Sequence, residues 1–195
     1  MTELLRNPKK LAKAKQELDE KIGQNQATIK ESDIPRLPYL QSVLKEAMRL
    51  HPTAPLLLPH RAQADVEICG HTVPKGTQVF VNYWAVSRDP ELWDDPAEFV
   101  PERFLGQNPK AHDSALMDFR GTNFAFTPFG SGRRICPGLS MGVRMLSLLL
   151  ATLVHRFDWE LPRGMGPKDI DVRDKFGVTL QRVTPLVATP VLRDN

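Results

Sequence analysis

Proline is the residue that most limits what this chain can fold into. It occurs 17 times in 195 residues, against an average frequency of about 5%. A proline inside a helix removes a backbone hydrogen bond and clashes with the preceding turn. We therefore expect short elements joined by turns, in one domain or two small ones, and neither a bundle of long helices nor an array of repeats.

The composition is that of an ordinary globular chain. Apolar residues make up 41% and charged residues 25%, which excludes a disordered or collagen-like protein. A net charge of +3 is too small to indicate a nucleic-acid partner. Two cysteines, Cys69 and Cys136, cannot form a disulfide framework. The first ten residues lack the apolar core of a signal peptide, and the longest apolar stretch, Leu139 to Val154, falls short of the roughly 20 residues of a membrane span.

Hydrophobic periodicity predicts three helices, over residues 2–22, 39–50 and 137–157. Pro8 is expected to separate the first turn of the first helix from the rest. The basic side of that helix, from Lys9 to Lys15, is expected to be a solvated face or a patch that docks a partner. The third helix is apolar on most faces, so we expect it to be buried.

Short strands are predicted between the helices. A β region covers about 66–82, and a terminal strand pair covers about 178–192, around Pro185. The segment from Asp94 to Phe129 reads as mostly irregular, and such a long irregular stretch is usually functional. The predicted class is mainly α with small β-sheets, an α+β fold.

The most informative segment runs from Phe126 to Gly138 and places Cys136 just ahead of the third helix. Glycines let this backbone turn sharply, and Pro137 suits the start of a helix. Free N–H groups and the helix dipole favour a thiolate here. A thiolate can be a nucleophile, a redox group or a metal ligand; the absence of a C-x-x-C pair weakens the zinc and thioredoxin interpretations, whereas thiolate ligation of haem iron needs one cysteine.

The fixed positions of this segment resemble the F-x-x-G-x-R-x-C-x-G signature of the cytochrome P450 family, the haem-thiolate monooxygenases. The matching residues are Phe129, Gly132, Arg134, Cys136 and Gly138. Glu46 and Arg49 match the family's E-x-x-R, and residues 101–104 match its PERF motif. The amino-acid sequences of several segments are similar to those of plant members that hydroxylate terpenoids and phenylpropanoids.

The resemblance implies a haem b site. Cys136 would be the axial ligand of the iron, and Gly132 and Gly138 would let the backbone approach the haem closely. Arg134 and His60 would each bind a haem propionate. Phe129 would pack beside the thiolate and shield it.

The resemblance also implies residues that act away from the iron. Glu46, Arg49 and Arg103 would form a structural triad that holds the loop carrying the cysteine. Two apolar segments would face the substrate, with the residues Ala54, Leu58, Gly177 and Val178. Cys69 matches no ligand position.

Nothing in the chain matches the family's oxygen-activating helix, its second haem-contacting helix or its membrane anchor. We therefore expect residues 1–195 to be the incomplete C-terminal portion of one P450 domain. The implied enzyme hydroxylates a small hydrophobic molecule with O2 and electrons from NADPH, delivered by a flavoprotein reductase, at the cytosolic face of the endoplasmic reticulum membrane. The isolated chain is expected to be inactive. The alternative is a truncated haem-binding or unfolded remnant without catalysis.

Overall fold

The computed structural model describes residues 1–24, 28–106, 117–177 and 179–193. Helices α1 (Thr2–Arg6), α2 (Pro8–Lys21), α3 (Pro38–Leu50) and α5 (Leu139–Arg156) form the main body, together with the short α4 (Tyr83–Val86). Four 3₁₀ turns also lie in the described residues: η1 (Glu31–Arg36), η2 (Pro101–Leu105), η4 (Gly132–Arg134) and η5 (Pro167–Asp169). The strands form two-stranded sheets, so the predicted class, mainly α with small β-sheets, is confirmed.

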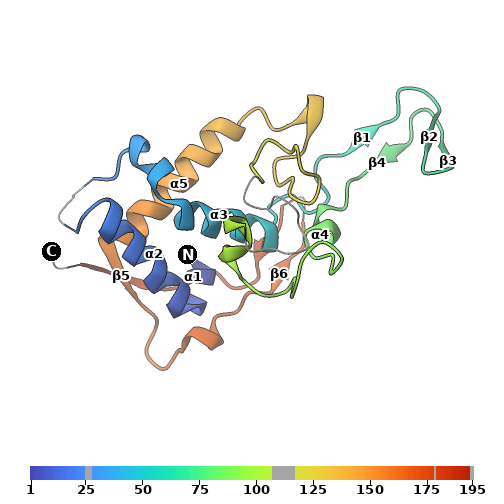
Figure 1. Cartoon of the computed structure of the whole chain (residues 1–195). Coiled ribbons are helices and arrows are strands. Elements are labelled where there is room, and N and C mark those ends of the chain that lie inside the picture. Colours follow the sequence, from blue (N-terminus) through green and yellow to red (C-terminus); the bar gives the residue numbers. More distant parts are fainter. Residues whose placement is uncertain (25–27, 107–116, 178, 194–195) are drawn as a thin grey trace.

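The main core lies where α1, α2, α3 and α5 meet (Figure 1). Its fully buried members come from all four helices and from the turn before α3: Leu4, Ala14, Leu18, Leu37, Leu40, Val43, Ala151 and Val154. On α3 these residues recur at helical spacing, so one face is apolar and packs inward. The C-terminal half of α3 carries the charged residues of the site described below.

The first predicted helix is divided as expected. Pro8 starts α2 and has no N–H to donate to the preceding turn, so α1 ends at Arg6. Asn7 adopts a non-helical conformation, with φ −121° and ψ 74°. Its side-chain amide donates to the Glu3 carbonyl at 2.8 Å, which satisfies one of the free carbonyls at the end of α1.

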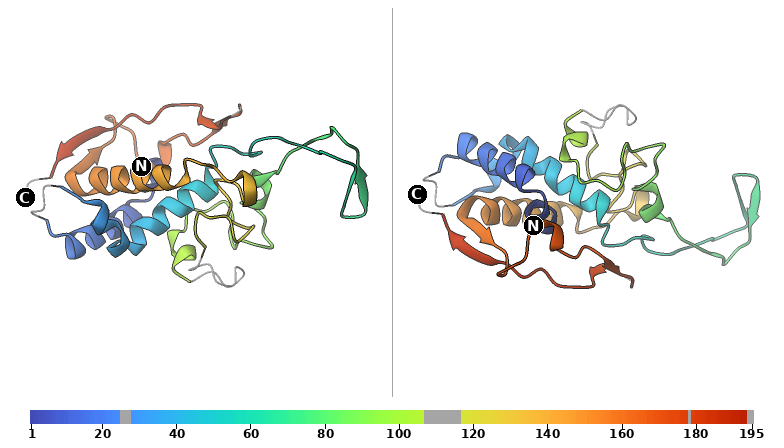
Figure 2. Two further views of the ribbon diagram at one scale, coloured as in Figure 1. Left: turned by 90° about the horizontal axis from the view of Figure 1, so that it is seen from above. Right: turned by 90° about the horizontal axis from the view of Figure 1, so that it is seen from below.

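The strands between α3 and α4 form an arm that extends away from the helices (Figure 2). Strand β1 (His60–Arg61) pairs with β4 (Gln78–Val79), and β2 (Val66–Ile68) pairs with β3 (His71–Val73), both antiparallel. Cys69 and Gly70 make the tight turn between β2 and β3 with positive φ angles of 49° and 77°. The arm therefore begins earlier than the predicted β region, because β1 was not recognised.

The predicted terminal strand pair is wrong. Strand β7 (Gln181–Arg182) pairs with β6 (Asp174–Lys175), and β8 (Thr189–Leu192) pairs with β5 (Phe157–Glu160). The sequence pattern predicted that the two neighbouring strands around Pro185 pair with each other, whereas each strand pairs with one that precedes it in the chain. Strand β5 follows α5 directly, without an intervening turn, at a position where the sequence predicted the end of a helix.

The expectation that the third helix is buried is also wrong. Helix α5 begins two residues later than predicted, at Leu139. It presents large apolar side chains to the surface, including Met141 (72% exposed), Met145, Leu146 and Leu149. By length and apolar composition alone, α5 could cross a membrane, and 22% of it is buried. An apolar helix that packs against protein can have the same length and composition. An apolar sequence shows that a helix could be buried on most of its faces. The described part of this chain covers only one side of α5, so the other apolar faces are exposed.

Candidate functional site

The loop before α5 brings the backbone of Phe129 and Cys136 together. The Cys136 N–H donates to the Phe129 carbonyl at 2.9 Å, which closes the intervening residues into a compact loop. Gly130 and Gly132 adopt φ angles of +76° and +65°, a region that residues with a side chain rarely occupy. The resulting loop holds a half-buried, free Cys136 thiol at the start of the helix.

Glycines also keep space beside the sulfur and the Phe129 ring. A Cβ atom on Gly138 would lie 3.7 Å from the Cys136 Sγ atom. A Cβ atom on Gly142, in the first turn of α5, would lie 3.7 Å and 3.8 Å from two carbons of the Phe129 ring. The Phe129 ring therefore packs against the first turn of α5.

The predicted anion-binding side chains remain accessible. Arg134 lies in η4 next to Arg133, and both are exposed. Neither guanidinium pairs with another side chain in the ranges that the structure describes. His60 is exposed on β1, where its backbone pairs with Val79. These groups are thus available to an acidic ligand group, in contrast to the arginines of the triad.

Glu46, Arg49 and Arg103 form a buried ion network. The Arg49 guanidinium donates to both carboxylate oxygens of Glu46, at 2.7 Å and 2.8 Å, and Arg103 Nε donates to Glu46 Oε1 at 3.2 Å. Glu46 and Arg49 are 0% exposed and Arg103 is 5% exposed. Two positive charges therefore share one carboxylate away from water.

Backbone carbonyl groups supply the remaining acceptors of the network. Arg49 donates to the carbonyl oxygens of Ser87, Pro96 and Glu98, at 2.6 Å, 2.9 Å and 3.2 Å. Arg103 donates to the Asp95 carbonyl at 2.9 Å. The network thereby fastens the irregular segment around residues 95–98 to α3 and to η2.

A chain of aromatic rings connects this network with the cysteine loop. The Arg49 guanidinium lies 5.1 Å from the centre of the Trp93 ring, and Trp93 lies 5.8 Å from Phe104. Phe104 packs edge-on against Phe126 at 4.9 Å. Trp93, Phe104, Met117 and Phe126 are buried together as a second, smaller core. Hydrophobic periodicity did not predict this core, because its members follow no helical or strand period.

The two segments predicted to face the substrate meet at one hydrogen bond. The Leu180 N–H donates to the Thr53 carbonyl at 2.9 Å, which joins the start of the first segment to the chain that follows Gly177. Ala54 is half-buried, Gly177 is exposed, and Leu58 is 72% exposed. Phe176, beside Gly177, is also exposed. Val178 lies outside the described residues.

The basic face of the first helix is largely neutralised. Lys10 and Lys13 on α2 pair with Glu102 at 2.7 Å and 3.0 Å, and Lys15 pairs with Asp158. Burial alone would raise the pKa of Glu102, but hydrogen bonds from the two lysines outweigh burial and lower it to about 2. Glu102, which the sequence analysis did not single out, thus ties α2 to the PERF turn.

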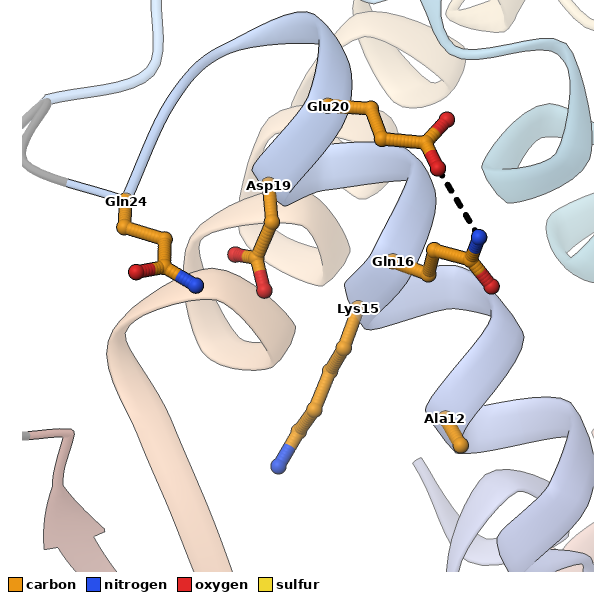
Figure 3. A pocket seen from close by; sticks show the side chains of 6 residues that line it. All are labelled: Ala12, Lys15, Gln16, Asp19, Glu20 and Gln24. Carbon is orange, nitrogen blue, oxygen red and sulfur yellow. Dashed lines mark hydrogen bonds between the residues drawn. The ribbon is translucent and has the colours of Figure 1, made fainter.

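A shallow hollow lies along α2, far from the cysteine loop in sequence. Its lining side chains are Ala12, Lys15, Gln16, Asp19, Glu20 and Gln24, with a hydrogen bond of 2.8 Å from Gln16 to Glu20 (Figure 3). Apart from Ala12, these are ordinary polar side chains on α2 and just after its end. This arrangement does not indicate a catalytic or binding site in the hollow, and Cys136 remains the centre of the candidate site.

Comparison with known proteins decides the family. A family model described as cytochrome P450 matches residues 1–187. The chain belongs to the cytochrome P450 family. The signature around Cys136 carries the resemblance in the sequence, and the order of the motifs, from Glu46 and Arg49 through Arg103 to Cys136, supports it.

Relatives from plants are similar over nearly the whole chain. Cytochrome P450 76C4 of Arabidopsis thaliana is 52% identical over 195 residues, which are 100% of this chain and 36% of that protein. Geraniol 8-hydroxylase of Swertia mussotii is 49% identical over 193 residues, or 98% of this chain and 37% of that protein. The chain thus spans little more than a third of the length of these P450 relatives.

A solved P450 structure supports the same fold. A zebrafish cytochrome P450 with abiraterone superimposes with a TM-score of 0.80 at 37% identity, covering 98% of this chain and 41% of that one. The helical body and the small sheets described above are therefore those of part of a P450 domain.

The residues of the loop fit a haem held by a thiolate. The Cys136 thiol is free and half-buried, and position 138 is a glycine whose added Cβ would lie 3.7 Å from the sulfur. Arg133 and Arg134 offer exposed guanidinium groups to carboxylates such as propionates. The part of the chain that the structure describes has no group of three or more His, Cys, Asp or Glu side chains that could hold a metal ion. Thiolate ligation of haem iron needs only one cysteine.

Proposed function

We propose that this chain forms the cysteine-ligand part of a cytochrome P450 monooxygenase that hydroxylates a small hydrophobic molecule. The observation that carries the proposal is the free Cys136 thiol, held at the start of α5 by its hydrogen bond to Phe129. When bound, a thiolate-ligated haem b supplies oxygen activation: one atom of O2 enters a C–H bond, and the other leaves as water with two electrons and two protons.

The residues of this chain have separate roles in the proposal. Cys136 would bind the iron, and the exposed Arg134 and His60 would each hold a propionate. Phe129 would keep water away from the sulfur, since its ring packs against Gly142 of α5 and its carbonyl accepts the Cys136 N–H. Gly132 and Gly138 leave room for the haem plane. Glu46, Arg49 and Arg103 fix the loop and do not take part in the chemistry.

The substrate proposal rests on the relatives and on the exposed apolar residues. Two relatives, at 49% and 50% identity, are named geraniol 8-hydroxylase and geranylhydroquinone 3''-hydroxylase. Leu58 and Phe176 offer apolar surface on two neighbouring segments. We propose a substrate with a geranyl-like hydrocarbon chain, tested by comparing the spectral binding of geraniol with that of a phenylpropanoid of similar size. Equal or weaker binding of geraniol would contradict this substrate class.

The electrons are proposed to come from NADPH through a flavoprotein reductase. Because Lys10, Lys13 and Lys15 are already paired with carboxylates, the exposed Arg133 is a better candidate for a contact with an acidic reductase surface. The proposed location is the cytosolic face of the endoplasmic reticulum membrane.

Replacement of the cysteine tests the ligand. In the complete haem-loaded protein, Cys136→Ser should abolish the Soret band that thiolate ligation gives to the reduced carbon monoxide complex. Cys69→Ser is the matched control, since Cys69 lies exposed at the tip of the β arm and should leave the band unchanged. Retention of the thiolate band in Cys136→Ser would refute the assignment.

The same measurements separate the enzyme from the non-catalytic alternative. A protein with a normal thiolate spectrum but no reductase-dependent product from any hydrophobic substrate would favour a haem-binding remnant. Product that depends on NADPH, O2 and Cys136 would establish the monooxygenase. The 195-residue chain by itself is expected to give no product, because it spans little more than a third of its relatives.

A further inference from the structure

Phe119 links the buried aromatic core with the cysteine loop. Its ring lies 5.6 Å from Phe126, a member of that core, and 5.8 Å from Phe129, which lies beside Cys136. The Phe119 and Phe129 rings meet at 82°, an edge-to-face arrangement. Such pairs have a preferred orientation because the edge of one ring is attracted to the face of the other.

The Phe129 ring is held from two sides. Phe119 packs against it from the irregular segment, and Gly142 of α5 approaches it closely enough that a Cβ there would touch the ring at 3.7 Å. The backbone of Phe129 is bonded in turn to Cys136, through the 2.9 Å hydrogen bond from the cysteine N–H. A change in the position of the Phe129 ring would therefore reach the cysteine through one residue and one hydrogen bond.

The backbone around Phe119 is fastened to the same loop. Ser131 Oγ donates to the Gly121 carbonyl at 2.7 Å. A Cβ atom on Gly121 would lie 2.4 Å from the Gly130 carbonyl oxygen, so the two segments approach as closely as glycine allows. Phe119 is thus fixed relative to residues 129–131 and can transmit the geometry of the aromatic core to them.

We propose that Phe119 is a positioning residue: its ring holds Phe129 against α5 and so maintains the geometry of the Cys136 ligand. The inference rests on the proposed haem-thiolate function. Phe119 touches neither iron nor substrate in this arrangement and acts through Phe129. Loss of the ring should let the Phe129 side chain turn and admit water to the sulfur.

The test uses the complete haem-loaded protein with Phe119→Leu, which keeps apolar volume but removes the ring. Its reduced carbon monoxide complex should lose the thiolate spectrum about two- to tenfold faster than the wild type, the range expected for one lost aromatic pair. The midpoint potential of the haem should shift as well. Phe119→Tyr, which retains the ring, should stay within about twofold of the wild-type rate.

Phe157→Leu is the matched control for general destabilisation. Phe157 lies in a comparable aromatic pair, 6.0 Å from Trp159, but at the other end of the 18-residue α5. It should lower the unfolding midpoint without altering the potential or the rate of spectral loss. Should Phe119→Leu not fold, Phe119→Met takes its place under the same criteria.

Three outcomes are distinguishable. A shifted potential and faster spectral loss in Phe119→Leu, absent in Phe157→Leu, would support the positioning role. Equal effects of the two variants, or a potential unchanged by Phe119→Leu, would overturn it. A wild-type protein that never gives the thiolate spectrum would refute the proposed function itself, and with it this inference.

Discussion

Replacing Glu46 by glutamine removes the one carboxylate that two buried arginines share. Glu46→Gln keeps the shape of the side chain and one carbonyl oxygen, but it leaves Arg49 and Arg103 without a counter-charge. Both guanidinium groups are almost completely buried, at 0% and 5% exposure. They cannot recover water without opening the contacts between α3 and η2.

The cost can be worked out from that burial. Removing one partner of a buried ion pair typically costs about 3–5 kcal/mol, because an uncompensated charge remains in a medium of low polarity. Four backbone carbonyl oxygens, those of Ser87, Asp95, Pro96 and Glu98, still accept hydrogen bonds from the arginines. We therefore expect a loss of about 3 kcal/mol, a large share of the roughly 5–15 kcal/mol that separates folded from unfolded protein.

Urea unfolding followed by tryptophan fluorescence is the suitable assay. Trp93 is fully buried and lies 5.1 Å from the Arg49 guanidinium, so its emission reports on the network directly. With a slope of about 2–3 kcal/mol per molar urea, the midpoint should fall by about 1 M or more. The haem-loaded protein should also release haem at a lower urea concentration than the wild type.

Glu102→Gln is the matched control, because it makes the same chemical change nearby. Glu102 pairs with two lysines at the surface, and such pairs contribute about 1 kcal/mol or less. If Glu46→Gln costs no more than Glu102→Gln, the reasoning from burial is wrong. Equal midpoints for Glu46→Gln and the wild type would show that water already reaches the arginines.

Two further predictions concern single side chains. The pKa of Glu102 is lowered from 4.5 to about 2 in the folded protein, so the ion pair with Lys10 and Lys13 stabilises above pH 4.5, and its contribution is lost as the pH falls toward 2. The stability difference between wild type and Glu102→Gln should hence be about 1 kcal/mol or less at neutral pH and smaller at about pH 3.5; a difference that grows in acid would contradict the sign. Gly142→Ala should raise the free energy of unfolding by about 0.5–1 kcal/mol, because alanine favours the helix and its Cβ would meet the Phe129 ring at an ordinary contact distance of 3.7 Å. A lower unfolding midpoint in Gly142→Ala would mean that the ring has no room for a methyl group.

The parts of the site that depend on regular structure were predictable from sequence. Residues three apart on a helix share a face, so the pairing of Glu46 with Arg49 followed from their spacing, and the structure shows it. The sharp turns around Gly130 and Gly132 followed from glycine's access to positive φ angles. The third member, Arg103, came from the family motif rather than from spacing.

The parts that depend on tertiary contacts were not predictable in the same way. The carbonyl groups of Ser87, Pro96 and Glu98 meet Arg49 because an irregular segment folds back over α3, and no local pattern encodes that path. Strand β5 forms because β8 lies beside it, more than 25 residues further along the chain. The exposure of α5 depends likewise on which surfaces the chain supplies, whereas its sequence records only that the helix is apolar.

Arginine rather than lysine at position 49 is explained by the irregular segment. A stretch without helix or strand must satisfy its backbone carbonyl groups by other means. All five N–H donors of Arg49 are used: two reach Glu46, and the others reach the carbonyls of Ser87, Pro96 and Glu98. A lysine has three donors on one nitrogen and no planar fork, so it would leave at least one of these buried acceptors without a partner, even though Glu46 Oε1 also accepts from Arg103 and from the Val100 N–H. The path of the segment from Trp93 to Phe104, and through the aromatic chain the position of the cysteine loop, is therefore set by a side chain of α3 that lies outside the loop it supports.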